Sequence, residues 1–256
     1  MNRTLNFAKR NLMEISRDVL SYIFCAAFPI VMLIIMTLVN SSIPKEAGMT
    51  IFRIDNLEGG IIIFGQTFVM LFTAINLAKD RGGSFLIRLF ATPMKSSDFT
   101  NGYILPMILV AVVQAVISLI VAVLIALIVG VEIKLLGFLL VLAAMLPSAL
   151  MFIAIGIIFG TLFNEKAAPG LCSIIISLGS FIGGIWFDVE GAGGVICKIS
   201  KCLPFFYCTK TVRSAIKLDL TWETFGLPII IVSASAIVLS ILAVFCFKKR
   251  MKADLA

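Results

Sequence analysis

The chain alternates between long apolar blocks and short polar gaps. Six apolar blocks reach the roughly 17–25 residues that a helix needs to cross a bilayer. They are residues 19–39, 60–78, 103–129, 135–162, 168–187 and 225–247. The pattern predicts an all-α integral membrane protein with six transmembrane helices in a single domain, residues 1–256.

Prolines occur at two kinds of position in these predicted helices, the first turn and the interior. Pro106, Pro169 and Pro228 fall in the first predicted turn of their helices, where a missing N–H does no harm. Pro29 and Pro147 fall inside predicted spans, where proline breaks a backbone hydrogen bond. We therefore expect kinks at these two positions. Residues 103–129 and 135–162 are long enough that we also expect them to tilt, kink or protrude.

The N-terminal residues 1–18 carry a different pattern. Apolar residues recur at intervals of three and four, and Lys9, Arg10 and Arg17 lie elsewhere around the same helix. The apolar set is Leu5, Ala8, Leu12, Ile15 and Val19. We predict an amphipathic interfacial helix with its basic side toward anionic headgroups. The alternative is a cytoplasmic extension of the first span.

Residues 188–224 form a gap that is too long for a plain turn. One helical stripe is apolar: Phe205, Cys208, Val212, Ala215 and Ile216. A second stripe is basic: Lys210, Arg213 and Lys217. The apolar patches are too short to span, so they predict extracellular re-entrant or interfacial helices before the last span. The alternative is a solvated loop, which the three consecutive aromatic residues 205–207 disfavour.

Composition supports a membrane protein. Apolar residues make up 61% of the chain, mean hydropathy is +1.12, and charged residues are 14%, about half the usual share. The net charge of +7 does not indicate nucleic-acid binding, because the charges lie in the gaps rather than on one face. With both termini placed in the cytoplasm, thirteen of the 21 Lys and Arg residues fall inside, which favours that orientation.

Several kinds of chemistry are missing from the sequence. It has no histidine, so metal sites and His-based acid–base catalysis are disfavoured. The predicted spans contain no ionisable acid or base, which weakens a proton-coupled carrier and leaves sodium coupling through backbone carbonyls open. No GxxxxGK[ST] motif is present, so any ATP-derived energy must come from a partner. Cys197, Cys202 and Cys208 share one loop and allow one disulfide, but their spacing selects no pair.

Uncharged polar residues occur within the predicted spans. Gln66, Thr73 and Asn76 share one face of the second span, and Ser177 and Ser180 share a face of the fifth. Interhelical hydrogen bonding is the favoured interpretation of each residue, and a path for an amphipathic substrate is the alternative. Two GxxxG motifs, at residues 156–160 and 179–183, predict close helix packing, within the subunit or in a dimer.

The gap between the second and third spans carries a short, delimited helix. Over residues 83–92, the apolar residues Phe85, Leu86, Leu89 and Phe90 share one face. Pro93 ends this helix, because the residue before a proline avoids the α region. Such a helix either rests on lipid headgroups or docks into a groove on a cytoplasmic partner.

These residues resemble a known family. The stretch DRGGSFLIRLFATPMKSSDFTNGYILP, residues 80–106, is similar to the coupling-helix segment of type-2 ABC exporter permeases, most specifically in RLFATP. SFIGGIWFDVE and the later LPFFYCTKTVR resemble the re-entrant region that follows the fifth span of that family. The chain departs from the family pattern at Lys79, Ser84 and Tyr103.

The resemblance implies half of an ATP-driven exporter in the plasma membrane. A separate cytoplasmic ABC ATPase subunit would bind ATP and Mg, and this chain, itself non-catalytic and without a cofactor, would pair with a second permease, identical or paralogous. The ATPase would contact Arg81, Phe85, Leu86, Arg88, Leu89, Phe90, Thr92 and Pro93. Gln66, Thr73, Asn76, Ser177 and Ser180 would line the path of a lipophilic substrate: a drug, antibiotic, lipid or peptide. A sodium-coupled carrier or channel, and a membrane immunity or sensor protein, are the competing hypotheses.

Overall fold

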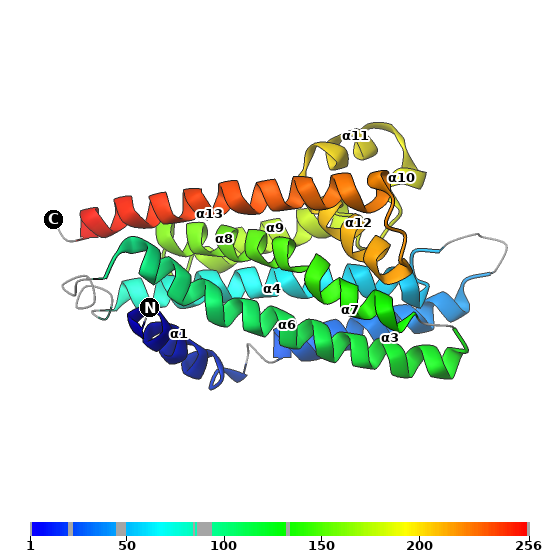
Figure 1. The fold of residues 1–256 in the computed structure, drawn as a ribbon, viewed down its shortest axis with the longest axis horizontal. Helices are drawn as coiled ribbons and strands as arrows, with labels where there is room; N and C mark the ends of the chain where they lie inside the picture. Colours follow the sequence, from blue (N-terminus) through cyan, green and yellow to red (C-terminus); the bar gives the residue numbers. More distant parts are fainter. Residues whose placement is uncertain are drawn as a thin grey trace.

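The computed structural model describes residues 2–19, 23–44, 50–83, 85, 94–131 and 134–254 as a bundle of α-helices without strands in these ranges (Figure 1). The helices are α1 Asn2–Ile15, α3 Phe28–Ser42, α4 Ile54–Gly82, α6 Ser96–Val129, α7 Leu135–Ala144, α8 Leu146–Leu162, α9 Ala168–Ile182, α10 Val189–Ala192, α11 Gly194–Cys202, α12 Pro204–Lys217 and α13 Leu227–Asp254. Short π-helical turns precede α3 and α13. Both termini and α1 lie at one end of the bundle, called here the termini end. The helices α10, α11 and α12 lie at the other, called the α12 end.

The all-α membrane class is confirmed by helix length and composition. Within the described residues, five helical segments are long and apolar enough to cross a bilayer. They are Ile23–Ser42, Ile54–Gly82, Ser96–Val129, Leu136–Leu162 and Trp222–Met251. On α6 and α13, the exposed fractions of Leu127, Ile128 and Ile241 are 75%, 85% and 65%. Such large exposed apolar side chains are typical of a lipid-facing surface.

The predicted fifth span, residues 168–187, is shorter than expected. Helix α9 has 15 residues and ends at Ile182, because the chain turns at Gly183 and Gly184. Gly184 has a φ of +67°, a left-handed conformation that glycine adopts at little cost. Beyond the turn, Arg213 of α12 binds the carbonyl oxygens of Gly184 and Ile185, so these residues fold back toward the bundle.

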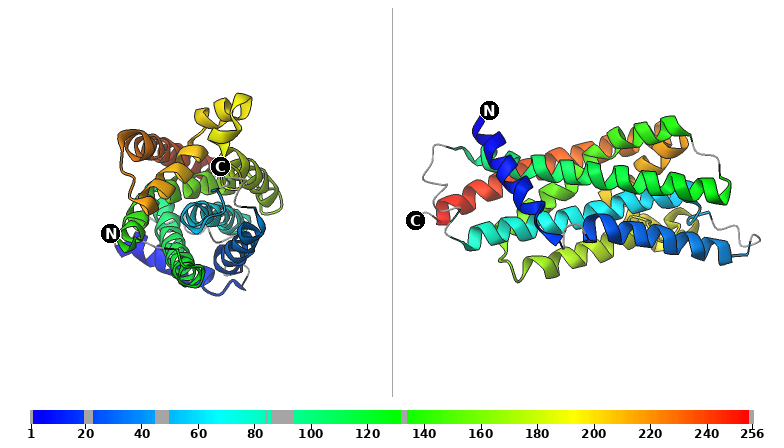
Figure 2. Two further views of the ribbon diagram at one scale, coloured as in Figure 1. Left: turned by 90° about the vertical axis from the view of Figure 1, so that its right-hand side faces the viewer. Right: turned by 90° about the horizontal axis from the view of Figure 1, so that it is seen from below.

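Helix α4 is the centre of the bundle (Figure 2). It packs against α8, α6, α12, α9 and α3 and is buried along most of its length. Its approach to α8 depends on Gly156 and Gly160, where a Cβ atom would lie 2.5 Å from Met70 O and 2.7 Å from Ala74 O. The first GxxxG motif therefore serves packing within this chain.

The ends of α4 correct the prediction for the second span. The helix begins at Ile54, ahead of the predicted start at residue 60, and therefore contains Asp55 and Glu58. The prediction that the spans hold no ionisable side chain is wrong, since Glu58 is buried with an exposed fraction of 1%. Hydropathy locates the apolar middle of a helix, whereas its first turn depends on neighbours such as α12 that cover it.

Two predictions about prolines have different outcomes. Pro106 lies inside α6 rather than in its first turn, because that helix begins at Ser96. The polar start of α6, residues 96–102, belongs to the helix but not to the apolar block that was used to predict it. At Pro147 the expected kink is present, since α7 and α8 are separated at Met145. Pro29 lies at the start of α3, just after a π-helical turn.

Residues 188–224 fold largely into helices, so the solvated-loop alternative is wrong. Cys208, Val212 and Ala215 of α12 are fully buried, as expected for the apolar stripe. The basic stripe does not stay together, because Arg213 turns into the bundle. Cys197, Cys202 and Cys208 are unpaired within the described residues, and Cys208 is buried.

Candidate functional site

A charged junction joins α1, α4 and α6 at the termini end. The Arg10 guanidinium donates two hydrogen bonds to the Asp80 carboxylate, at 2.8 and 3.0 Å. The Tyr103 hydroxyl donates a third bond to Asp80, at 2.6 Å. Asp80 is buried with an exposed fraction of 7%, so its charge is balanced almost entirely by these two partners. A bidentate Arg–carboxylate pair fixes relative orientation as well as distance. We call Arg10, Asp80 and Tyr103 the junction.

Arg10 makes two further contacts that stabilise its charge. Its guanidinium lies 2.7 Å from a Glu14 carboxylate oxygen and 4.0 Å from the centroid of the Phe85 ring. Partial burial alone would lower the pKa of Arg10, but hydrogen bonding and attraction from Asp80, with a smaller contribution from Glu14, raise it. Arg10 therefore faces a protein carboxylate, which corrects the expectation that it faces lipid headgroups.

An aromatic cluster lies beside the junction. Phe7 of α1 contacts Phe85, Phe99 and Tyr103, with ring centroids 6.4, 5.7 and 5.2 Å apart. It also lies against Gly102, where any Cβ atom would overlap its ring. Phe7 thus sets which face of α1 is buried, and Leu5 and Val19 of the predicted apolar stripe are exposed instead. Helix α1 crosses α6 at a steep angle (Figure 2), as an interfacial helix would, rather than extending the first span.

Asn11 holds α1 on α6 at a point that Pro106 creates. Because proline lacks an N–H, the carbonyl of Gly102, four residues earlier, has no helical partner. The Asn11 side-chain amide donates to this oxygen at 3.0 Å, in a buried position.

We expect Asn11→Ala to lower the free energy of unfolding by about 1–2 kcal/mol, because Gly102 O would be left buried without a donor. Asn101→Ala is the matched control, since Asn101 is exposed beside Gly102, and it should change stability by less than about 0.5 kcal/mol. Thermal unfolding of the two purified variants in detergent checks this. Equal stability would contradict the assigned role of Asn11.

The residues predicted to contact an ATPase are only partly within the described chain. Phe85 lies against Phe7 and Arg10, so the start of the predicted helix is attached to the junction. Arg81 donates to the carbonyl oxygens of Gly160 and Phe163 at the end of α8, at 3.0 and 3.3 Å. The remaining predicted contacts lie outside the described residues: Leu86, Arg88, Leu89, Phe90, Thr92 and Pro93.

The structure does not gather the residues of the predicted substrate path at one place. Gln66 is buried between α4 and α8, where it accepts from Ser148 at 2.7 Å and donates to Met145 O at 3.2 Å. The Thr73 and Ser180 hydroxyls donate to backbone oxygens of their own helices. Ser177 is exposed on α9. Hydrogen bonding therefore accounts for Gln66, Thr73 and Ser180.

Asn76 has a different environment, because it lines an open cavity of about 610 Å³ beside the junction. Charged residues from α1, the end of α4 and the α8–α9 connection share this lining, among them Arg10, Glu14, Lys79 and Glu165. The Asn76 side-chain nitrogen is buried and has no hydrogen-bond partner among the described residues. Of the five predicted path residues, Asn76 is thus placed where a polar group of a substrate could reach it.

At the α12 end, Arg213 ties three segments together. Its guanidinium donates to Asn56 O and Gly184 O at 2.8 Å each, and to Ile185 O at 3.2 Å. Burial lowers the pKa of Arg213 to about 10, and Asp188 partly opposes this. At neutral pH the side chain therefore keeps its charge, and it is held by carbonyl dipoles rather than by a carboxylate partner.

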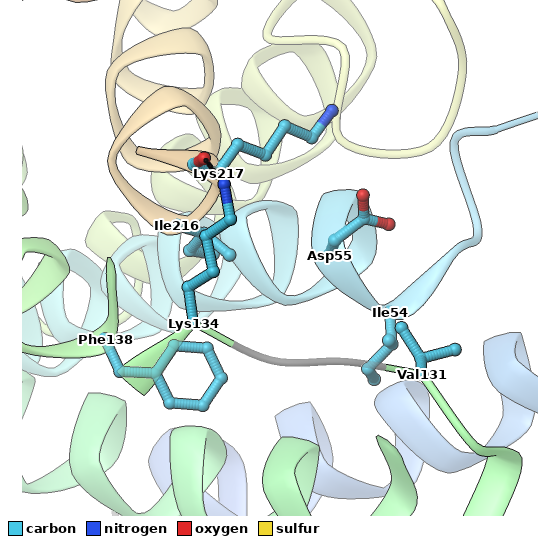
Figure 3. A pocket seen from close by; sticks show the side chains of 7 residues that line it. All are labelled: Ile54, Asp55, Val131, Lys134, Phe138, Ile216 and Lys217. Atoms are coloured by element: carbon cyan, nitrogen blue, oxygen red, sulfur yellow. Dashed lines mark hydrogen bonds between the residues drawn. The ribbon is translucent and has the colours of Figure 1, made fainter. Parts of the chain in front are cut away.

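Next to Arg213, a pocket of about 230 Å³ opens at the same end of the bundle (Figure 3). Its polar lining consists of Asp55, Lys134 and Lys217, and its apolar lining includes Ile54 and Phe138. Burial lowers the pKa of Lys217, while Asp55 acts in the opposite direction. The pocket is therefore lined by both signs of charge, with Asp55 from α4 and the two lysines from other segments.

Sequence analysis missed the junction. Asp80 was noted as part of a polar gap, but nothing in the sequence indicated that its partner lies in the N-terminal helix. The departure from the family pattern at Tyr103 was a signal, because a tyrosine at that position supplies the hydroxyl that Asp80 accepts from. Within the described residues, no cluster of three or more His, Cys, Asp or Glu side chains could hold a metal ion.

Comparison with known proteins adds one finding. The family model described as "ABC-2 type transporter" matches residues 4–217, which run from α1 to the end of α12. A search of the curated proteins finds no match. The matched range contains the junction, the segment after Phe85 and Arg213.

Proposed function

Because this chain belongs to the ABC-2 type transporter family and is a permease subunit of that kind, we propose that it exports a hydrophobic or amphipathic molecule using energy from a separate ATPase. The ATPase subunit would bind ATP and Mg on the cytoplasmic side. A second permease, identical or paralogous, would complete the path through the plasma membrane. The excess of Lys and Arg in the gaps at the termini end supports a cytoplasmic location for both termini.

The junction is the observation that carries this proposal. Asp80 lies at the end of the central helix α4, and Phe85 follows it immediately before the segment that resembles a coupling helix. Any displacement of that segment by an ATPase would pull on Phe85, and through Phe7 and Arg10 on α1 and α6. A displacement of this segment would therefore move α1, α4 and α6 together, because the contacts of the junction fix their relative orientation.

The substrate class follows from the apolar surfaces and the cavity at Asn76. A cavity with a polar lining that lies beside the lipid-facing helices suits a molecule with an apolar body and a polar end. A drug, an antibiotic, a lipid or a hydrophobic peptide fits this description. Gln66, Thr73, Ser177 and Ser180 would contact it only after the helices move apart.

We expect Arg88→Glu and Leu89→Asp each to reduce substrate-stimulated ATP hydrolysis and transport at least about tenfold, while membrane insertion is retained. The physical reason is that a groove on the ATPase would lose about 1.4 kcal/mol or more of binding when a charge is reversed or buried at its centre. The measurement is co-reconstitution of each variant with the ABC ATPase that co-purifies with the wild-type chain, followed by assays of ATP hydrolysis and lipophilic substrate efflux.

Ser97→Ala is a matched control, since Ser97 is exposed at the start of α6 just beyond this segment. Normal transport by Arg88→Glu and Leu89→Asp would contradict the coupling assignment. Gradient-driven flux by the wild-type chain reconstituted without any ATPase would instead favour the sodium-coupled carrier or channel.

A further inference from the structure

Three polar side chains at the interface of α4 and α6 are buried without partners. Glu58 of α4 and Gln114 and Ser118 of α6 have exposed fractions of 1%, 3% and 1%. Both carboxyl oxygens of Glu58, both amide atoms of Gln114 and the Ser118 hydroxyl lack a hydrogen-bond partner among the described residues. Such groups are normally satisfied in a native interior, so this cluster needs an explanation.

The cluster is compact and has a route to the α12 end. The Ser118 hydroxyl lies near the Glu58 carboxyl group but not in hydrogen-bonding geometry with it. Gln114 lies one turn earlier on α6, packed directly against Gly65 of α4. In the other direction, Glu58 is one helical turn below Ile54 and Asp55, which line the pocket of Figure 3. The carboxyl group therefore lies just beneath an opening at the α12 end.

No described cation is arranged to neutralise a charge on Glu58. Arg213 of α12 is near, but its guanidinium donates to three backbone carbonyls. The remaining charged groups at this end are Lys217 of α12, Lys134 before α7 and Asp55 of α4 itself, which line the open pocket instead. The exposed Arg53, just before α4, pairs with Asp55. Among the other elements that pack on α4, the described parts of α3, α8 and α9 contain no acidic or basic side chain, and those of α6 contain only Asp98, at its far end.

A polar side chain elsewhere on the same helix is satisfied, although Asn76 beside the open cavity is not. Gln66, two turns along α4, exchanges hydrogen bonds with α8 through Ser148 and Met145 O. A buried polar side chain on α4 can therefore make all its hydrogen bonds, and the lack of partners at Glu58 does not follow from the packing of this helix in general. A carboxylate in this position would pay the full cost of desolvation, whereas a protonated carboxyl group both donates and accepts, as the hydroxyl of Ser118 does.

We propose that Glu58, with Ser118 and Gln114, forms a proton-binding site that holds one proton while α4 and α6 are closed. When the interface opens toward the pocket, water reaches the carboxyl group, which releases its proton as a hydronium ion and becomes a hydrated carboxylate. Closure requires the proton to return. Opening of the bundle at the α12 end would therefore depend on the proton concentration in the medium at that end. This proposal does not rest on the presence of an ATPase or on the identity of the substrate.

The test compares wild type, Glu58→Gln and Glu223→Gln in lipid nanodiscs. Glutamine matches the shape of the neutral carboxyl group, and Glu223 is an exposed glutamate that serves as the control. Between pH 6 and pH 8, the thermal midpoint of wild type and Glu223→Gln should fall by about 2–4 °C per pH unit more than that of Glu58→Gln. Dicyclohexylcarbodiimide, which reacts with protonated carboxyl groups in apolar surroundings, should label Glu58 at pH 7 in wild type, as located by mass spectrometry.

Two results would overturn the proposal. The first is the same pH dependence of the midpoint in wild type and Glu58→Gln, since it would mean that Glu58 takes up no proton in this range. The second is a rise in the wild-type midpoint with NaCl, absent with choline chloride and absent in Glu58→Gln, because the cluster would then hold a sodium ion through its oxygen atoms.

Discussion

Asp80→Ala is expected to lower the free energy of unfolding by about 3–5 kcal/mol and to abolish coupling to an ATPase. Removing the carboxylate leaves the Arg10 guanidinium without its bidentate partner and the Tyr103 hydroxyl without an acceptor. Breaking one side of a buried ion pair costs more than the pair is worth, and here Arg10 would keep only the partly exposed Glu14 as a carboxylate partner. Thermal unfolding in detergent and the ATPase assay of the reconstituted complex measure the two effects.

A control and a rescue distinguish coupling from stability. Asp55→Ala should cost less than about 1 kcal/mol, because Asp55 lines an open pocket and its partner Arg53, 3.4 Å away, is exposed. The double variant Arg10→Met with Asp80→Leu replaces the pair with apolar side chains of similar size, and should recover part of the stability, since the Tyr103 hydroxyl would still lack its acceptor. It should not recover coupling, because two apolar side chains can slide where a bidentate pair cannot. Full coupling in the double variant would reduce the junction to a structural role.

The apolar blocks predicted the fold because helices in a bilayer must bury every backbone hydrogen bond within themselves. The same argument does not locate helix ends, since beyond the apolar middle a polar residue can either extend the helix or leave it. At α4 this uncertainty concealed Glu58, which lies before the apolar block that begins at residue 60 and yet is deeply buried. The length of α9 was also missed, because the turn at Gly184 is stabilised by Arg213, a residue far along the chain.

The candidate site depends partly on local sequence and partly on contacts between distant residues. The helix over residues 83–92 was predicted from adjacent residues, its apolar face and Pro93, and beyond Phe85 it stays a prediction. The partner of Asp80 is separated from it by 70 residues, and no periodicity within α1 distinguishes Arg10 from Lys9 or Arg17. Gln66 could be assigned to hydrogen bonding on general grounds, but the choice of Ser148 and Met145 O as its partners depends on the packing of α4 on α8.

Arg213→Ala is the second substitution for which we expect a large effect, a loss of about 3–5 kcal/mol in the free energy of unfolding. Three carbonyl oxygens, of Asn56, Gly184 and Ile185, would lose a charged donor in a buried position. These oxygens belong to the first turn of α4 and to the turn after α9, so the variant should loosen the α12 end as a unit. Hydrogen exchange measured by mass spectrometry should rise in residues 54–60 and 183–187, and not in α1.

Arg213→Lys discriminates between charge and geometry. A lysine retains the positive charge, but its ammonium group is a single point and cannot span carbonyls from two segments as a planar guanidinium does. We expect it to keep less than half of the stability that Arg213 supplies. Lys210→Ala on the same helix should cost less than about 1 kcal/mol, since the partners of Lys210 are the exposed Glu190 and, at 5.6 Å, the face of the Phe206 ring. Wild-type stability in Arg213→Lys would mean that charge alone holds the turn after α9 against α4. In that case the planar geometry of the guanidinium group would not be needed for the fold-back that shortens the fifth predicted span.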